Sequence, residues 1–222
     1  VLPTATPTEE LPVLIITPYE STATPLPTSV VENDSDECDI PFYPVSDGAV
    51  WEYDLSSGEH ATHTMVVDEN DAFTISIQGD ASAFTIDGAC TEEGIVLMDS
   101  NMITTTNTDD QGASMLTTRD ASGVTLPKDI KINDVWSQTI HVTTGEYSST
   151  IQTDYTAVGF ENISVPAGDF YVLKIEQSGY VEIFGQTVDM HGYQWFAEGV
   201  GTVRSAMDGA PTAELVSYDI PD

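Results

Sequence analysis

Four histidines, His60, His63, His141 and His191, are the residues best suited to bind a metal ion or to transfer protons near neutral pH. Only His60 and His63 are close to each other in the sequence. Residues at that spacing on a β-strand face opposite sides of the strand, and a zinc site uses roughly three or four ligands. We therefore expect no metal site at these histidines.

Carboxylates are far more abundant, with 37 Asp and Glu against five Lys and Arg and a formal net charge of −32. Two oxygen-rich segments, Asp68-Glu69-Asn70-Asp71 and Asn107-Thr108-Asp109-Asp110, could hold calcium. Neither has the spacing of an EF-hand loop, so we expect solvated turns and no cofactor, with calcium as the alternative. The charge repels phosphate groups, which excludes nucleic acid as a partner.

Motifs of common enzymes are missing from the sequence. It has no Gly-x-Ser-x-Gly nucleophile motif, no His-Glu-x-x-His zinc motif and no glycine-rich phosphate loop. A glycosidase would need two carboxyl groups at a defined separation, and a sequence with 37 acidic residues cannot single out such a pair. We therefore expect a protein that is not an enzyme.

The region from Cys38 to Asp222 has the pattern of an all-β domain. Trp51, Tyr53 and Leu55 alternate with Glu52 and Asp54, which is typical of a strand with one buried face. No window has a sustained helical apolar stripe. We expect an antiparallel β-sandwich or a strongly curved sheet. The expected strands are 51–55, 62–67, 72–78, 83–86, 94–98, 102–106, 114–118, 135–143, 149–160, 170–177, 180–184, 186–196, 201–207 and 213–218.

Residues 1–37 differ from the rest because they are rich in Thr and Pro, and they predict an extended N-terminal tail. Within this tail, residues 11–18 read Leu-Pro-Val-Leu-Ile-Ile-Thr-Pro, an apolar strand with nothing nearby to pack against. One interpretation is a donor strand that completes the sheet of a neighbouring subunit. The other is a surface stalk whose threonines carry sugars. The donor residues would be Leu11, Val13, Leu14, Ile15 and Ile16.

Cys38 and Cys90 form an even pair, which favours one disulfide in an oxidising compartment over a zinc site. A bridge between them would contribute about 4 kcal/mol in the chain-entropy account of disulfides. Asn33 and Asn162 match the acceptor pattern for N-linked glycosylation, a short pattern that also occurs by chance.

Several short motifs are spread over the region after Cys38. They are Pro41-Phe42-Tyr43-Pro44-Val45, Gly48-Ala49-Val50-Trp51-Glu52-Tyr53, Cys90 with Glu93-Gly94-Ile95, Leu126-Pro127-Lys128 with Val135-Trp136, Val165-Pro166-Ala167-Gly168 with Phe170, and Tyr193-Gln194-Trp195-Phe196-Ala197-Glu198-Gly199-Val200-Gly201. On these motifs the chain resembles the TapB-like group of secreted or surface-attached bacterial β-proteins with a Thr/Pro stalk. The resemblance implies an antiparallel β fold and a place outside the cytoplasm.

Two functions fit these observations. The first is a structural subunit of an extracellular, pilus-like filament, in which each copy donates its tail strand to the next copy in a head-to-tail homopolymer. The alternative is a monomeric, stalked cell-surface module that binds a small apolar ligand or a polysaccharide inside a curved sheet. Both place the chain outside the cytoplasm. The sequence has no apolar run long enough for a transmembrane helix, so we expect no membrane insertion of the mature chain.

Overall fold

The computed structural model describes residues 38–68, 72–80, 82–98, 117–144, 147–183 and 185–221. The tail 1–37, with its proposed donor strand and Asn33, lies outside the described residues, as does the expected strand 102–106. We call these described residues the β-body.

The described residues form strands joined by turns and contain no α-helix, which confirms the predicted all-β fold. No helix among them is long and apolar enough to cross a membrane. The strands are β1 Val50–Leu55, β2 His60–Val67, β3 Ala72–Gly79, β4 Ala83–Thr91, β5 Gly94–Met98, β6 Thr117–Gly123, β7 Leu126–Pro127, β8 Val135–Thr144, β9 Tyr147–Val165, β10 Gly168–Ile183, β11 Gln186–Ala197, β12 Gly201–Met207 and β13 Ala213–Asp219.

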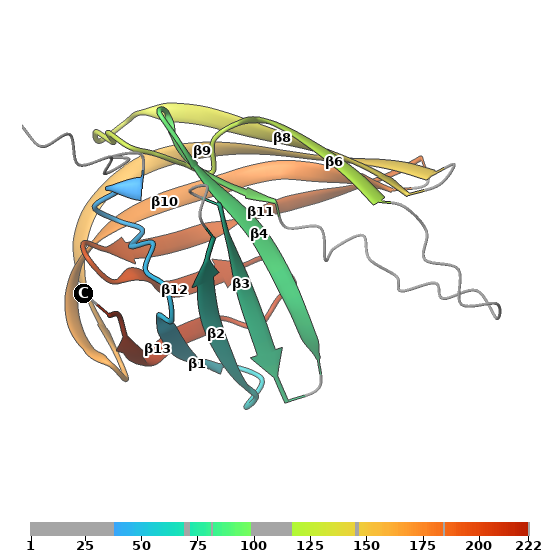
Figure 1. The fold of residues 1–222 in the computed structure, drawn as a ribbon. Helices are drawn as coiled ribbons and strands as arrows, with labels where there is room; N and C mark the ends of the chain where they lie inside the picture. The colour runs from blue at the N-terminus through green and yellow to red at the C-terminus, as the bar shows by residue number, and fades with distance from the viewer. Residues whose placement is uncertain are drawn as a thin grey trace, which may run out of the picture. The chain divides into compact units, whose positions relative to one another are not determined.

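All of these strands belong to one antiparallel sheet in the order β6-β8-β9-β10-β11-β12-β13-β1-β2-β3-β4-β5-β7. The first and last strands of this order, β6 and β7, are neighbours in the sequence and are separated only by Val124 and Thr125. The sheet must therefore curve until its two edges meet, and Figure 1 shows this curvature. Of the two architectures expected from the sequence, the strongly curved sheet is the one formed.

No regular ladder pairs β6 with β7 in the described residues, and the two edges are joined instead at a seam made of Thr125, Trp136 and Gln138. The Thr125 N–H donates to Ile95 O (2.8 Å), and the Thr125 hydroxyl accepts from the Leu97 N–H (2.7 Å). The Gln138 amide donates to Leu97 O (2.9 Å), and the Trp136 indole donates to Thr125 O (3.1 Å). Gln138 is 4% exposed. Its bonds therefore lie away from water, where they stabilise the seam most.

Two hydrophobic clusters lie along this sheet. The larger includes Trp51, Met65, Ile75, Leu173 and Leu215 and packs the concave side. The smaller, which we call the distal cluster, consists of Ile140, Val142, Ile151 and Val181. Ile140 of β8 pairs with Ile151 of β9, which pairs with Val181 of β10, and these three strands are longer than β1 to β5.

The sequence analysis was wrong to end one strand at Gln177 and begin another at Tyr180. β10 runs unbroken through Gly179, which pairs with Thr153 of β9 and Met190 of β11. A Cβ atom on Gly179 would lie 2.0 Å from Gln152 O. Glycine is required here because the β9 backbone approaches closely, and the chain makes no turn.

The predicted disulfide between Cys38 and Cys90 is present, with a Cα–Cα distance of 5.2 Å. It ties the segment before β1 to β4, the third strand from the β7 edge of the sheet. The turn glycines Gly168 (φ 137°) and Gly199 (φ 69°) have positive φ, as the sequence predicts for positions that disfavour other residues.

Candidate functional site

A cavity of about 380 Å³ lies on the concave face of the sheet. Its walls come from β1 to β5, β7 and β11 to β13, so strands from both ends of the body contribute. Most of the lining is apolar. The cavity is lined by Tyr43, Pro44, Trp51, Tyr53, Leu55, Glu59, His60, Ala61, His63, Ile75, Ile77, Gly79, Asp80, Ser82, Phe84, Ile86, Ile95, Leu97, Thr125, Leu126, Gln194, Phe196, Gly201, Thr202, Ser205 and Ala213.

Strand alternation explains why this face is apolar. Trp51 pairs with His63 and Tyr53 pairs with Ala61, and all four residues line the cavity. Their neighbour Glu52 is exposed on the other face of β1. Neighbouring strands have the same alternation of inward and outward side chains, because residues directly opposite each other in an antiparallel pair point to the same side. The alternation of apolar and polar residues in β1 is therefore an alternation between side chains that face the cavity and side chains that face solvent.

Two large aromatic side chains of the wall, Trp51 and Tyr53, donate their polar hydrogens to backbone carbonyls. The Trp51 indole donates to Val200 O (2.7 Å), and the Tyr53 hydroxyl donates to Thr202 O (2.8 Å). Burial raises the pKa of Tyr53, so this hydroxyl stays protonated. The rings therefore present apolar surface to the cavity, while their donors hold the β12 end of the sheet to β1.

Other polar side chains on the wall differ, because no hydrogen bond joins them to any described residue. They include His63 of β2, Gln194 of β11 and Ser205 of β12. His63 packs against the Tyr53 ring, with ring centroids 4.6 Å apart. Burial lowers the pKa of His63 to about 4, so its imidazole is neutral at pH 7. The wall thus offers hydrogen-bonding groups without charge.

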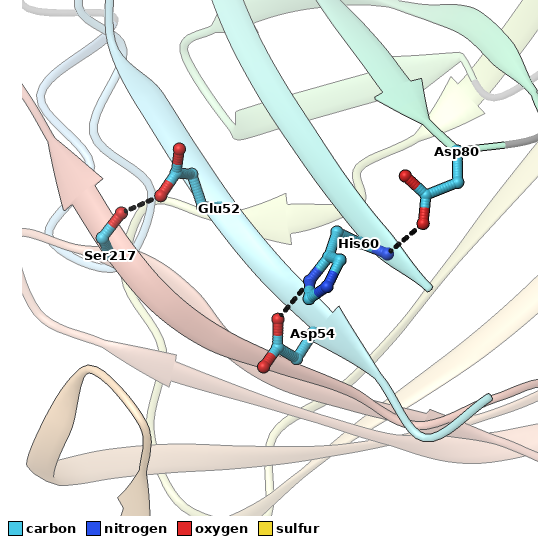
Figure 2. A network of polar contacts seen from close by, with 5 residues as sticks. All are labelled: Glu52, Asp54, His60, Asp80 and Ser217. Carbon is cyan, nitrogen blue, oxygen red and sulfur yellow. Dashed lines mark hydrogen bonds and ion pairs between the residues drawn. The ribbon is translucent and has the colours of Figure 1, made fainter. Parts of the chain in front are cut away.

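The mouth of the cavity lies at the turns between β1 and β2 and between β3 and β4. Among the lining residues, Glu59, His60, Asp80 and Ser82 are the exposed ones, and all belong to these turns or their edges. Figure 2 shows how the two turns are tied together. The His60 backbone N–H donates to the Asp80 carboxylate (3.1 Å), and His60 Nδ1 lies 2.6 Å from Asp54 Oδ1.

A second polar cluster lies on the opposite, outer face of β10 to β12. His191 Nε2 lies 3.0 Å from Glu176 Oε1, and His191 Nδ1 lies 3.5 Å from Asp208 Oδ2. The hydrogen bond with Glu176 raises the pKa of His191 and lowers that of the carboxyl. Lys174 lies beside this cluster, 4.4 Å from the centre of the Tyr193 ring. The described residues contain no group of His, Cys, Asp and Glu placed to hold a metal ion.

The structure separates the residues that the sequence analysis considered for metal binding. The His60 ring contacts Asp54 at the mouth of the cavity, whereas His63 pairs with Trp51 on its wall. His141 contacts Thr150 (3.1 Å) and His191 lies on the outer face. Of the first calcium candidate only Asp68 is described, and the second lies outside the described residues.

Asn162, the described glycosylation candidate, is exposed on β9. The sequence analysis did not single out the cavity residues Gln194, Ser205 and Asp80. The apolar alternation of β3, Phe73, Ile75 and Ile77, indicates which face is inward. It does not indicate that the inward side chains leave space between them.

Two solved structures resemble this fold. One is a candidate exported protein with a YmcC-like fold from Bacteroides fragilis, with a TM-score of 0.56 and 13% identity. The other is a candidate lipoprotein from Parabacteroides distasonis, with a TM-score of 0.53 and 14% identity. Each similarity covers 81% of this chain and 99% of the other. At these identities the comparison establishes a shared fold.

No curated protein matches the chain. The resemblance to the TapB-like group has no counterpart in these comparisons and stays a prediction. A family match covers most of the body and includes the residues from the first cavity strand to the turn after β12. Residues 51–210 match the DUF3108-like family, and because this is well over half of the sequence, the chain belongs to that family.

Proposed function

We propose that the β-body is an extracytoplasmic binding module that holds a small apolar ligand in its cavity. This is the alternative function that the sequence analysis raised. The observation that carries it is the cavity of about 380 Å³ with a mainly apolar wall and an opening at one end. That size falls within the range of roughly 300 to 1,000 Å³ that is typical of small-molecule sites.

Packing supports the proposal. Protein interiors are close-packed, and voids larger than a water molecule are few. Here Ile75, Ile77, Ile95 and Leu126 are buried and yet border open space. Larger side chains at Ala61 or Ala213 would fill part of it. A ligand with apolar surface would make van der Waals contacts with these wall residues on the side where no protein side chain touches them.

Two observations support a location outside the cytoplasm. The Cys38–Cys90 disulfide is typical of proteins from oxidising compartments. Both structural neighbours are described as candidates for export or lipid attachment. We propose that this chain also acts in the extracellular space or at the cell surface.

The proposal is tested with a fluorescent apolar probe, N-phenylnaphthylamine, titrated into the purified chain. We expect saturable binding that is lost in Ala61→Phe, because Ala61 faces the cavity from β2. The matched control is Val66→Phe on the same strand, since Val66 is 57% exposed and should leave binding unchanged. Absence of saturable binding to the wild-type chain would refute the proposal.

The filament hypothesis depends on Leu11, Val13, Leu14, Ile15 and Ile16, which lie outside the described residues, so it stays a prediction. Electron microscopy of the full chain beside a variant without residues 1–20 tests it. Fibres that vanish with the deletion would support strand donation between copies. Monodisperse particles in both samples would count against it.

A further inference from the structure

We infer that the cavity takes an uncharged amphiphile, with its chain against the deep apolar wall and a hydroxyl or amide head group near the mouth. This inference rests on the proposed function, because it names the class of ligand for the same cavity. It follows from the distribution of polar and charged groups along the cavity.

The deep part of the cavity suits a hydrocarbon chain. Ile75, Ile86, Ile95, Leu97 and Leu126 line it from β3, β4, β5 and β7. Ile95 is fully buried and Leu126 is 2% exposed, so this wall lies away from solvent. Burial of a chain here would remove apolar surface from water without the loss of any polar contact.

The uncharged polar groups gather nearer the mouth. By strand register, Leu55 of β1 lies opposite Ala213 of β13, Ala213 opposite Ser205 of β12, and Ser205 opposite Gln194 of β11. All four line the cavity, so they form one row across the wall. Leu55 is the last residue of β1, at the end where the mouth opens.

Ser205 and Gln194 have no hydrogen-bond partner among the described residues, although both lie in this partly enclosed row. A hydroxyl can donate and accept, and an amide can do both at separate atoms. Together they can satisfy a neutral head group that carries hydroxyl or amide functions. Their side-chain polar atoms are not buried away from solvent, so both are open to pair with a ligand in the cavity.

The charges at the mouth disfavour an anionic head group. Glu59 and Asp80 lie on the rim, and no Lys or Arg is among the residues that line the cavity. The described cations Lys174 and Arg204 engage Glu161 and Glu214 on the outer face. A fatty acid carboxylate or a phosphate would therefore meet repulsion at the mouth and find no counter-charge inside.

The rim does not form a cation site either. Asp80 accepts the His60 backbone N–H, and Asp54 is paired with the His60 ring. Glu59 accepts a hydrogen bond from Ser57. These carboxylates already have partners, so none is left unpaired for a cationic head group. The unpartnered groups are the neutral ones, so we assign a neutral ligand.

Displacement of bound N-phenylnaphthylamine by ligands with the same chain and different heads tests this assignment. The ligands are monolauroylglycerol, laurate and dodecyltrimethylammonium, each used below its micelle concentration at pH 7 and constant salt. We expect monolauroylglycerol to displace the probe at a concentration at least about tenfold below that of either charged ligand.

Two variants separate the contribution to ligand binding of the rim charge Glu59 from that of the polar groups Gln194 and Ser205. Glu59→Lys should improve displacement by laurate and leave monolauroylglycerol nearly unchanged. Ser205→Ala combined with Gln194→Leu should weaken monolauroylglycerol about tenfold while the probe still binds. Ser217→Ala is the control, because Ser217 donates to Glu52 on the other face of the sheet (Figure 2).

Equal or better displacement by laurate or by dodecyltrimethylammonium would overturn the assignment of an uncharged ligand while the binding function stood. The double variant would also overturn it if monolauroylglycerol bound as well as before. Failure of the wild-type chain to bind the probe at all would instead overturn the proposed function.

Discussion

The region around the cavity and the region around the distal cluster belong to the same sheet, but their buried side chains are packed differently. The cavity region has most of the buried apolar residues, and some of them, such as Trp51, Ile75 and Ile95, border open space. The distal cluster has only Ile140, Val142, Ile151 and Val181, between 1% and 6% exposed. The number of buried apolar side chains therefore does not measure how tightly a region is filled.

Polar side chains in the two regions differ in the same way. On the extended strands, Tyr180 donates to Gln152 (3.1 Å) and His141 contacts Thr150 (3.1 Å). On the cavity wall, Gln194, Ser205 and His63 lack such partners among the described residues. The polar side chains of the distal region are thus used within the fold, whereas those of the cavity wall are open to a ligand.

The largest effect should follow from loss of the disulfide, which belongs to the cavity region. Replacing Cys38 and Cys90 together by Ala should lower the free energy of unfolding by about 4 kcal/mol, because the bridge closes a loop with a sequence separation of 52. Urea unfolding measures this change. A loss below about 1 kcal/mol would contradict the expected role of the bridge.

Matched isoleucine truncations compare the two regions directly. Ile151 is 6% exposed in the distal cluster and Ile75 is 5% exposed beside the cavity. Ile151→Ala should cost about 3 kcal/mol and Ile75→Ala about 2 kcal/mol, since Ile75 has fewer neighbours to lose on its cavity side. Equal costs by chemical denaturation would show that the cavity wall is as tightly packed as the distal cluster.

The pH dependence of stability should show a contribution from His63. Its pKa in the folded chain is about 4, against 6.5 for an ordinary histidine. Between these values the unfolded chain binds more protons, so stability falls as the pH drops from 6.5 toward 4. We expect a loss of about 2 kcal/mol from this residue, with allowance for its partial exposure.

His63→Phe should remove that part of the acid sensitivity. The readout is the difference between the two stability profiles, because the carboxylates titrate in both proteins. If the stability of the wild-type chain and that of His63→Phe fall equally from pH 6.5 to 4, burial does not keep His63 neutral.

The smallest effect should come from His191 on the outer face. Because the pKa of His191 is raised, its contribution to stability is complete below pH 6.5 and is lost as the pH rises through its pKa in the folded chain. The lowered pKa of Glu176 means that its contribution is complete above pH 4.5 and lost below it. His191→Gln should therefore reduce thermal stability slightly between pH 4.5 and 6.5 and not at pH 9 or higher. A uniform loss at every pH would indicate a packing role instead.

Local pattern was enough to predict most of the strands, because alternation such as Trp51-Glu52-Tyr53-Asp54 depends only on which face is buried. It failed at Gly179, since a glycine that admits a neighbouring backbone looks the same in sequence as one that makes a turn. Likewise, Gln194 and Ser205 become a pair only through the register of β11 and β12. The cavity depends on sheet curvature, which no single strand encodes.

The order in which the strands meet has a consequence for how this chain folds. The seam bonds between Leu97 and Thr125 and between Leu97 and Gln138 join residues only 28 and 41 positions apart. The pairing of β1 with β13, by contrast, brings Val50 to Asp219. Contacts between distant residues slow folding because a long loop must close first. During synthesis the two halves of the sheet therefore stay unjoined until β13 emerges, and its pairing with β1 connects them.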